Sequence, residues 1–309
     1  MSNEPQEITR TSVAALDEIL GRPLRILDDG FVRVIDYMGA DESIVQAARV
    51  SYGRGTKQLR EDRGLIRYLM RHRHSTPFEM CEIKLHVRVP MDCWRQWIRH
   101  RTANVNEYST RYSIAIDAAQ RTAPAEWRAQ ANRNKQGSGA KLSSSVGEKL
   151  SKRESEFLRL SREIYEERLS EGVAREQARK DLPLSTYTEA YWKVDLHNLL
   201  HFLELRMDAH AQAEIRAYAT AIGEEIVSRW CPAAWEAFRD YRLGLVAFTA
   251  SEASIIQALL QSPEQARTIA IAEHLLNADG TRPKRSRELE ELEGKLTRLG
   301  FTLPWSDQR

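Results

Sequence analysis

The clearest pattern of hydrophobic and polar positions lies in residues 81–90, CEIKLHVRVP. Every second residue from Ile83 to Val89 is apolar and the residues between them are polar, which predicts a strand with one buried face. Residues 31–39, FVRVIDYMG, are rich in β-branched and aromatic side chains and end at Gly39, so they are predicted to form a second strand.

Most of the remaining chain spaces its apolar residues three and four apart, as amphipathic helices do. Helices are predicted over residues 41–53, 60–73, 91–100, 152–170, 173–181, 192–207, 210–229 and 233–243, with a helical lead-in at 1–24 and helical stretches beyond 245. Residues 102–112 have no apolar period and are predicted to be a loop. Residues 128–150, rich in Ser, Gly, Asn and Lys, are predicted to be a mobile surface loop. Two strand regions among many helices favour an α+β fold over a parallel βαβ series.

Charge and cysteine content narrow the class of protein. The 309 residues carry 46 basic and 44 acidic side chains, a balance that argues against a dedicated nucleic-acid-binding protein. The three cysteines form no CxxC pair and cannot frame a disulfide scaffold. The N-terminus lacks the apolar core of a signal peptide, and no apolar run approaches the ~20 residues of a membrane helix. We therefore expect a cytoplasmic protein without a membrane partner.

The densest candidate chemistry is the stretch RHRTANVNEYSTRY at residues 99–112. On the preceding helix, Trp94 and Trp97 fall on one side, while Gln96 and Arg99 fall on the other. Arginines suit planar, bidentate recognition of phosphate or carboxylate, and the hydroxyl groups of the stretch add further donors. A solvated helix face would explain the charges alone, but the combination with the polar loop favours a nucleotide site.

These residues also carry a resemblance to a known family. An Arg-His-Arg triplet, seven residues and then Ser is the signature of the flavin-dependent thymidylate synthases, and Arg99, His100, Arg101 and Ser109 match it without a gap. Further similar blocks follow in the same order as in that family: AARVSYG (47–53), HSTPFE (74–79), RQWIRHR (95–101), AREQARKDLP (174–183), YTEAYWKVDLHNLLHFLELRMDAHAQAEIR (187–216) and CPAAWEAF (231–238).

The resemblance implies a domain organisation and a reaction. The family-like domain covers residues 28–243, after an N-terminal lead-in at 1–27 and before a helical extension of unknown role at 244–309. The implied fold is an antiparallel sheet packed with several long helices, without a Rossmann domain. The implied reaction makes dTMP from dUMP, taking a methylene group from 5,10-methylenetetrahydrofolate and a hydride from FAD that NADPH has reduced. A homotetramer with active sites between subunits is implied as well.

The resemblance also assigns roles to individual residues. The dUMP-binding residues it implies are Gln96, Arg99, Glu107, Tyr108, Ser109, Thr110, Arg111, Arg179 and Arg206. The FAD-binding residues it implies are Ser51, Thr76, Arg99, His100, Arg101, Glu107, Asp195, His197 and His201. The catalytic positions are Arg206, His74 and Ser109, and His74 occupies the place of a family histidine near flavin and folate.

The chemistry of the reaction is consistent with these assignments. Uracil C5 is a poor nucleophile, and a buried guanidinium can activate it by stabilising negative charge on the ring. We expect Arg206 to do this and Arg111 and Arg179 to bind the phosphate. Ser109 lacks a surrounding G-x-S-x-G elbow, so a ligand-binding hydroxyl is favoured over a nucleophile. Cys231 is expected to be a small buried residue and not a nucleophile.

The helix at 192–207 is expected to stand between two sites. His197 and His201 are one turn apart, whereas Asp195 and Arg206 share another face at 3.6 residues per turn. No G-x-G-x-x-G is present, so any flavin must be held by side chains such as these.

Two alternatives remain open at the level of sequence. His197 and His201 have the spacing of zinc ligands, and His210 or Asp208 could be a third ligand of a helical metal-dependent enzyme. Position 198 is Asn, however, so the general base of H-E-x-x-H is absent. The Arg, Trp and Tyr residues around 94–112 could instead bind single-stranded nucleic acid, against which the near-neutral charge counts.

Overall fold

The computed structural model describes residues 9–50, 59–131 and 137–305. Its internal packing divides the chain into two compact units, Met1–Leu243 and Gly244–Arg309, and each is described by itself.

A five-stranded sheet forms the framework of the first unit. Its strands are β1 (Leu24–Ile26), β2 (Gly30–Met38), β3 (Glu82–Pro90), β4 (Asn104–Glu107) and β7 (Tyr187–Asp195). Their order is β1-β2-β3-β7-β4, and every neighbouring pair is antiparallel. The predicted α+β class with an antiparallel sheet is confirmed.

Alternating side chains give this sheet one apolar face. On β3, Ile83 and Leu85 are fully buried, as the period-two pattern predicts. Leu85 stands opposite Trp192 of β7, which is 1% exposed. The central strands β3 and β7 therefore present a continuous hydrophobic surface for helices to cover.

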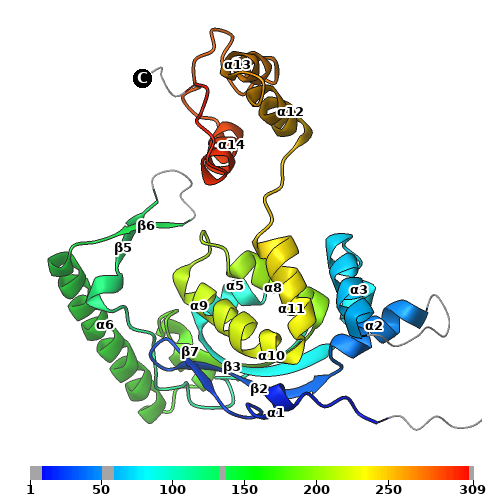
Figure 1. Ribbon diagram of the computed structural model, residues 1–309. Helices are drawn as coiled ribbons and strands as arrows, with labels where there is room; N and C mark the ends of the chain where they lie inside the picture. Colours follow the sequence, from blue (N-terminus) through cyan, green and yellow to red (C-terminus); the bar gives the residue numbers. More distant parts are fainter. Residues whose placement is uncertain (1–8, 51–58, 132–136, 306–309) are drawn as a thin grey trace, which may run out of the picture. The chain divides into compact units, whose positions relative to one another are not determined.

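Helices of the same unit cover that face. Figure 1 shows α5 (Met91–Trp97), α8 (Leu196–Arg206), α9 (Ala213–Ala221), α10 (Ser228–Trp230) and α11 (Pro232–Phe238) gathered over the sheet. Trp97 lies between the two layers, with its ring centroid 5.2 Å from that of Trp192 and 4.7 Å from that of Phe202. Such aromatic pairs contribute about 0.5–1.5 kcal/mol each beyond their buried area, so they fix α5 and α8 against the sheet.

Shorter elements complete the first unit. They are α1 (Ala14–Asp17), α2 (Asp41–Val50), α3 (Leu59–Arg71), α4 (Thr76–Glu79), the 3-10 turns Pro124–Glu126 and Arg179–Asp181, α7 (Arg175–Ala178), and the π-helical turns Ile222–Val227 and Arg239–Leu243. At the start of α11, the backbone N–H groups of Ala233 and Ala234 donate to the carboxylate of Asp41, which joins α2 to α11.

Four sequence predictions were wrong in part. The described part of the lead-in is helical only at Ala14–Asp17, because the chain then pairs as β1. Asn104–Glu107 is an edge strand where a loop was predicted, since backbone pairing with β7 needs no apolar period. Residues 192–195 belong to β7, so the helix predicted over 192–207 begins later. The fourth error concerns residues 128–150.

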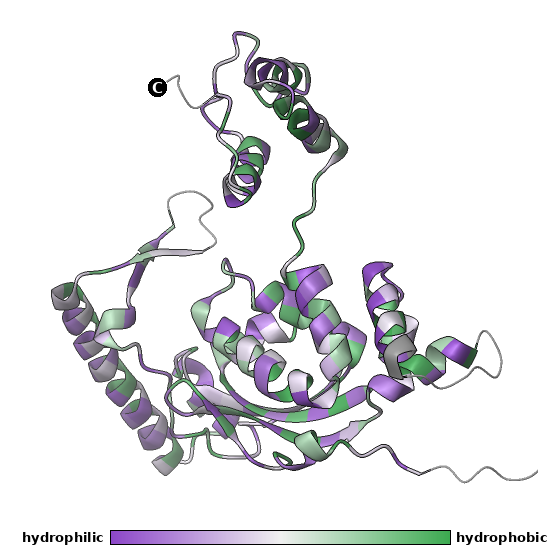
Figure 2. Ribbon diagram, viewed as in Figure 1, coloured by the Kyte–Doolittle hydropathy of each residue, from purple (hydrophilic) through white to green (hydrophobic). Residues whose placement is uncertain are grey.

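Much of the predicted loop at 128–150 is regular structure. Strands β5 (Arg128–Gln130) and β6 (Ser138–Lys141) form a separate two-stranded sheet, and α6 (Ser144–Ser170) begins well before residue 152. Figure 2 shows hydrophilic and hydrophobic residues interleaved along α6. Leu158 and Tyr165 are buried, whereas Phe157 is 56% exposed. The Ser-rich composition that suggested a loop at 143–145 instead marks the beginning of this helix.

The second unit has its own small core. It contains α12 (Ala250–Leu259), α13 (Pro263–Ala272) and α14 (Arg287–Arg298). Thr249 and Glu252 form a capping box at the start of α12. Lys295 of α14 lies 2.8 Å from the carboxylate of Glu252, which ties α14 to α12. None of the helices in the described part of the chain combines the length and the apolar character that a membrane crossing requires.

Candidate active site

The first part of the candidate site is the junction of α5 and α8. Arg206 is the last residue of α8, and its Nε donates to Nε2 of His100, just beyond α5, at 3.2 Å. Its Nη2 donates to the backbone carbonyl of Gln96 at 3.2 Å. The guanidinium is thus anchored from two directions, and Gln96 is itself hydrogen-bonded to Gln212.

Burial and neighbouring charge set the protonation of this junction. Burial, together with nearby Arg206 and His201, lowers the pKa of His100 to about 4. His100 is therefore a neutral imidazole at neutral pH. Because its Nε2 accepts from Arg206, we assign its proton to Nδ1. Burial also lowers the pKa of Arg206, but a guanidinium stays charged at neutral pH.

The second part of the candidate site is β4 and the turn that follows it. Glu107 is exposed on this edge strand, and its Oε1 accepts from Oγ1 of buried Thr188 on β7 at 2.9 Å. Beyond the strand, Nη1 of Arg179 donates to Oγ1 of Thr110 at 2.6 Å. The structure thus joins residues 107 and 110 of the signature segment to chain distant in sequence.

The third part is a cavity of about 390 Å³ beside α8, which we call the histidine cavity. It is lined by Met70, Arg73, His74, Phe78, His197, Leu200, His201, Glu204, Phe238 and Arg242. The ring centroid of His201 lies 5.8 Å from that of His100. His201 therefore connects this cavity to the α5–α8 junction.

Other residues singled out in the sequence lie apart from these contacts. Arg99, Arg101 and Arg111 are exposed, and Arg111 lies over the ring of Tyr112. Thr76 is exposed at the first residue of α4. The roles predicted for these residues stay predictions.

Three further positions complete the set. The backbone carbonyl of Ser109 accepts from the N–H groups of Tyr112 and Ser113 at 3.1 and 3.0 Å. Tyr108 is 38% exposed, and its hydroxyl donates to the carbonyl of Ile114 at 2.8 Å. Ser51 lies outside the described residues.

Asp195 has a local structural task that the sequence analysis missed. It is the N-cap of α8, where its Oδ1 accepts from the backbone N–H of Asn198 at 2.9 Å. Its Oδ2 accepts from the side-chain amide of the same residue at 2.7 Å. The expectation that Asp195 shares a helical face with Arg206 was wrong, because Asp195 ends β7 and is not within the helix.

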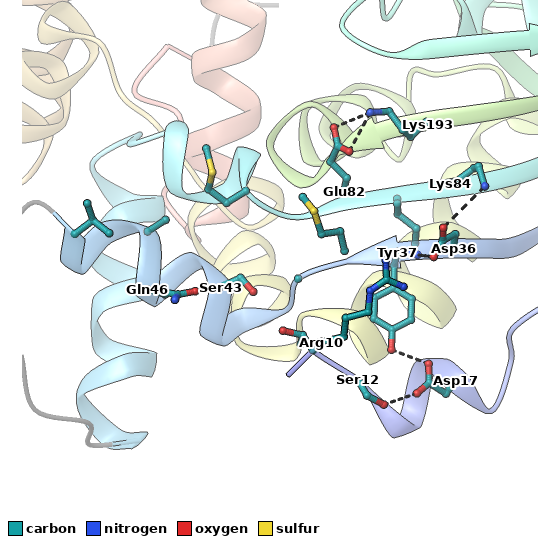
Figure 3. A pocket seen from close by; sticks show the side chains of 17 residues that line it. Arg10, Ser12, Asp17, Asp36, Tyr37, Ser43, Gln46, Glu82, Lys84 and Lys193 are labelled. Carbon is teal, nitrogen blue, oxygen red and sulfur yellow. Dashed lines mark hydrogen bonds and ion pairs between the residues drawn. The ribbon is translucent and has the colours of Figure 1, made fainter. Parts of the chain in front are cut away.

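A larger hollow of about 850 Å³ has none of the residues of these three groups in its lining, and Figure 3 shows the side chains that do line it. It is bordered by the N-terminal segment, β2, α2 and β3. Its charged side chains are largely matched within the hollow: Lys193 lies 2.8 Å from Glu82, and Lys84 lies 4.0 Å from Asp36. Of the residues assigned to dUMP or FAD, those that the structure describes do not line it.

Comparison with known proteins decides the family. The model of the thymidylate synthase complementing protein family matches residues 33–233, more than half of the chain. The flavin-dependent thymidylate synthase of Gluconobacter oxydans (strain 621H) is 51% identical over 265 residues, covering 84% of this chain and 86% of that protein. The enzyme of the same name from Wolbachia pipientis wMel is 49% identical over 258 residues, covering 84% of this chain and 90% of that protein. The chain belongs to the flavin-dependent thymidylate synthases.

A solved structure agrees with this assignment. The UMP/dUMP methylase PolB from Streptomyces cacaoi, bound with 5-Br dUMP, superposes with a TM-score of 0.64 at 31% identity. The match covers 71% of this chain and 98% of PolB. The family resemblance drawn from the signature at 99–109 is confirmed.

The metal-dependent alternative finds no support in the geometry. Within the part of the chain that the structure describes, no three His, Cys, Asp or Glu side chains are grouped so that they could hold a metal ion. His210 instead pairs with Asp208, its Nδ1 lying 2.8 Å from Oδ1. Neither joins His197 and His201 at the histidine cavity.

The cysteines do not offer a thiolate nucleophile. Cys231 is fully buried, and burial raises the pKa of its thiol well above the ordinary value. Cys93 is also fully buried. Both fill space in the core, as the sequence suggested for Cys231.

Sequence reasoning missed residues that the structure places at the site. Thr188 reaches Glu107, and Gln212 reaches Gln96. Arg73 and Arg242 line the histidine cavity from α3's end and from a π-helical turn. Arg73 is the one with a signal in the sequence, since it stands in the Arg/His-rich run RHRH at 71–74, whose last residue begins the family block at 74–79.

Proposed function

We propose that this chain reductively methylates dUMP to dTMP, with 5,10-methylenetetrahydrofolate as carbon donor, FAD as the flavin and NADPH as the reductant. The observation that carries this proposal is the anchored guanidinium of Arg206, held by His100 and by the Gln96 carbonyl. A partly buried, fixed cation can stabilise negative charge on a pyrimidine ring more strongly than a solvated one.

Different residues of the dUMP site contact different parts of the nucleotide. Arg206 faces the ring and stabilises charge as C5 attacks the methylene carbon. Arg179 and Arg111 bind the phosphate, with Thr110 holding the guanidinium of Arg179 in place. Glu107, fixed by Thr188, accepts from an N–H of the ring or a hydroxyl of the sugar. PolB, the structural neighbour, was solved with a halogenated dUMP, which supports a nucleotide of this kind as the ligand.

The chain offers side chains that suit a flavin. The histidine cavity combines imidazoles with the apolar side chains of Leu200 and Phe238. Such a lining suits an aromatic ring system. His197, His201 and His100 would hold the flavin, and His74 would lie near its ring. The flavin supplies the hydride that completes the methyl group, and the protein positions the reactants.

We also propose a homotetramer whose active sites form between subunits. Glu107, Tyr108 and Arg111 are exposed on an edge strand and its turn. A site closed by a second chain would give these groups the dry surroundings that catalysis needs. Light scattering under assay conditions tests this, and a monomer that turned over at full rate would contradict it.

Product analysis tests the function directly. Purified protein is incubated with FAD, NADPH, methylenetetrahydrofolate and dUMP, and dTMP is followed by chromatography. We expect dTMP and tetrahydrofolate only when FAD and NADPH are both present. A Ser109→Ala sample is run beside it, because surviving activity would rule out an essential serine nucleophile. Absence of dTMP from folded, FAD-loaded protein would contradict the proposal.

A further inference from the structure

An arginine occupies a backbone position that favours glycine at the end of α3. Arg73 has φ of 60°, in the left-handed region. The N–H of His74 donates to the carbonyl of Leu69 at 3.0 Å, and that of Arg73 donates to Met70 at 3.3 Å. This is the hydrogen bonding of a helix end that usually has glycine in the left-handed position. Strain of this kind persists only where the surrounding structure holds the residue in place, and it clusters at functional sites, so Arg73 is a candidate for function.

The side chain of Arg73 lines the histidine cavity together with Arg242. Among the described residues, neither guanidinium has an ion pair or side-chain hydrogen bond. By contrast, the nearby Arg67 pairs with Asp240 and Glu236. The cavity has a single carboxylate, that of Glu204, against two guanidiniums and three imidazoles. Its charge therefore favours an anion.

Backbone irregularity places both arginines. Arg242 lies in the π-helical turn Arg239–Leu243 that ends the helical layer of the first unit. π-Helical turns are rare in proteins, and many of those that occur lie at functional sites. Two unusual backbone conformations, one at the end of α3 and one after α11, thus direct to the same cavity two guanidiniums without an ion-pair partner in the described part of the chain.

We propose that Arg73 and Arg242 form an anion clamp that binds the charged end of an exchanging co-substrate, either a phosphate of the nicotinamide nucleotide or a glutamate carboxylate of the folate. This rests on the proposed function. Arg73 and His74 are exposed, at the cavity's rim. A resident cofactor is largely enclosed, whereas a co-substrate must leave after each turnover, and its charged end lies away from its reacting ring. The rim therefore suits the co-substrate better than the flavin.

The test compares Arg73→Gly and Arg242→Gln with the wild-type holoenzyme. Arg73→Gly should raise the thermal midpoint by about 2–4 °C, because glycine relieves the left-handed strain. The same substitution should raise the KM of one co-substrate about tenfold or more, because it removes a hydrogen bond to a charged group. Arg242→Gln should raise the same KM without the gain in stability. The dissociation constant of FAD should stay within twofold in both variants.

The choice of co-substrates distinguishes the two sources of the anion. If the clamp binds the 2′-phosphate, the preference for NADPH over NADH falls in both variants and the KM of folate is unchanged. If it binds the folate tail, the KM of methylenetetrahydrofolate rises, and more so for forms with several glutamates than for the monoglutamate. Unchanged KM values for both, or weakened FAD binding with unchanged KM values, would overturn the proposal.

Two control variants separate strain and charge from the clamp. Leu27→Gly also relieves a left-handed residue, with φ of 58°, far from the cavity in sequence and outside its lining. It should gain stability without a change in KM. Arg239→Gln removes an arginine from the same π-helical turn, but one that does not line the histidine cavity, and it should leave KM unchanged.

A binding measurement keeps this proposal separate from the proposed reaction. Calorimetric titration of the FAD-loaded protein with NADP⁺, NAD⁺ and folate reports on the clamp even if no dTMP forms, because the oxidised nucleotides carry the same phosphates and cannot reduce the flavin. Loss of binding in Arg73→Gly and Arg242→Gln, alongside a wild type that binds but makes no dTMP, would support the clamp and contradict the reaction. If the wild type makes dTMP and both variants bind these ligands as the wild type does, the reaction is supported and the clamp is contradicted.

Discussion

Two regions of the candidate site differ in how completely the chain surrounds them. At the α5–α8 junction, Arg206 is partly buried and hydrogen-bonded to His100 and to a backbone carbonyl. On β4 and the turn after it, Glu107 and Tyr108 are exposed, and Thr188 and Arg179 donate hydrogen bonds to Glu107 and Thr110. The first region is preorganised by a single chain, whereas the second is open for ligand or for another subunit. The difference separates residues expected to act on the reaction from residues expected to act on binding.

The largest effect should come from the enclosed region. Arg206→Ala should lower kcat by about 10²–10³-fold, the usual cost of removing one preorganised charge-stabilising group. Flavin binding should be largely retained, because the histidine cavity does not include Arg206. Steady-state kinetics at saturating substrate measures the first quantity, and flavin absorbance measures the second. The control is Arg216→Ala, whose guanidinium donates to the carbonyl of Ala209. Full activity in Arg206→Ala would show that ring activation has another source.

The next effect concerns how Arg206 is held. His100→Leu should lower kcat by about ten- to a hundredfold, because it removes the acceptor of the Arg206 Nε and leaves that donor unsatisfied. His100→Gln keeps an acceptor at the end of a similar side chain and should recover much of the loss. Steady-state kinetics with the KM of dUMP measured separately checks this. Equal losses in both variants would indicate that the imidazole serves the flavin and does not position Arg206.

A smaller effect is expected at the open region. Thr188→Val keeps the shape of a buried side chain and removes its hydrogen bond to Glu107. It should raise the KM of dUMP by about three- to tenfold, the worth of one such bond, with little change in kcat. Thr186→Val, on a residue that is also buried but does not reach Glu107, is the matched control. A fall in kcat as large as that in His100→Leu would remove the distinction between the two regions.

The contrast also marks what the sequence could predict. Strand β3 could be predicted from its alternation of apolar and polar residues, because in a sheet with one buried face the residues on that face are buried and the others are not. Strand β7 was missed as a whole, because residues 187–191 were given no element and the short apolar stretch that follows, before a helix, is compatible with either period. The signature at 99–109 identified the family because its residue types are specific to that site.

What remained was spatial contact between distant residues. His100 and Arg206 are 106 positions apart, and no local pattern records their hydrogen bond. The same holds for Thr188 and Glu107, which meet because β4 pairs with β7. The Arg/His-rich run at 71–74 draws attention to Arg73, but its left-handed backbone could not be predicted, because that conformation depends on where the helix ends. Local periodicity in the sequence predicts individual helices and strands. The residues of the site meet only through strand pairing and helix packing, which local periodicity does not record.

The smallest effect is one of pH on the enclosed region. Burial lowers the pKa of His100 to about 4 from an ordinary 6.5, so the unfolded chain binds more protons than the folded one between these values. The stability that neutral His100 contributes is therefore fully present above pH 6.5 and is lost as the pH falls toward 4. His100→Gln removes this titration, and its free energy of unfolding should depend less steeply on pH in that window. Urea unfolding at several pH values measures both slopes. Parallel curves would mean that His100 titrates as an exposed histidine does, and that the junction is as open to water as β4.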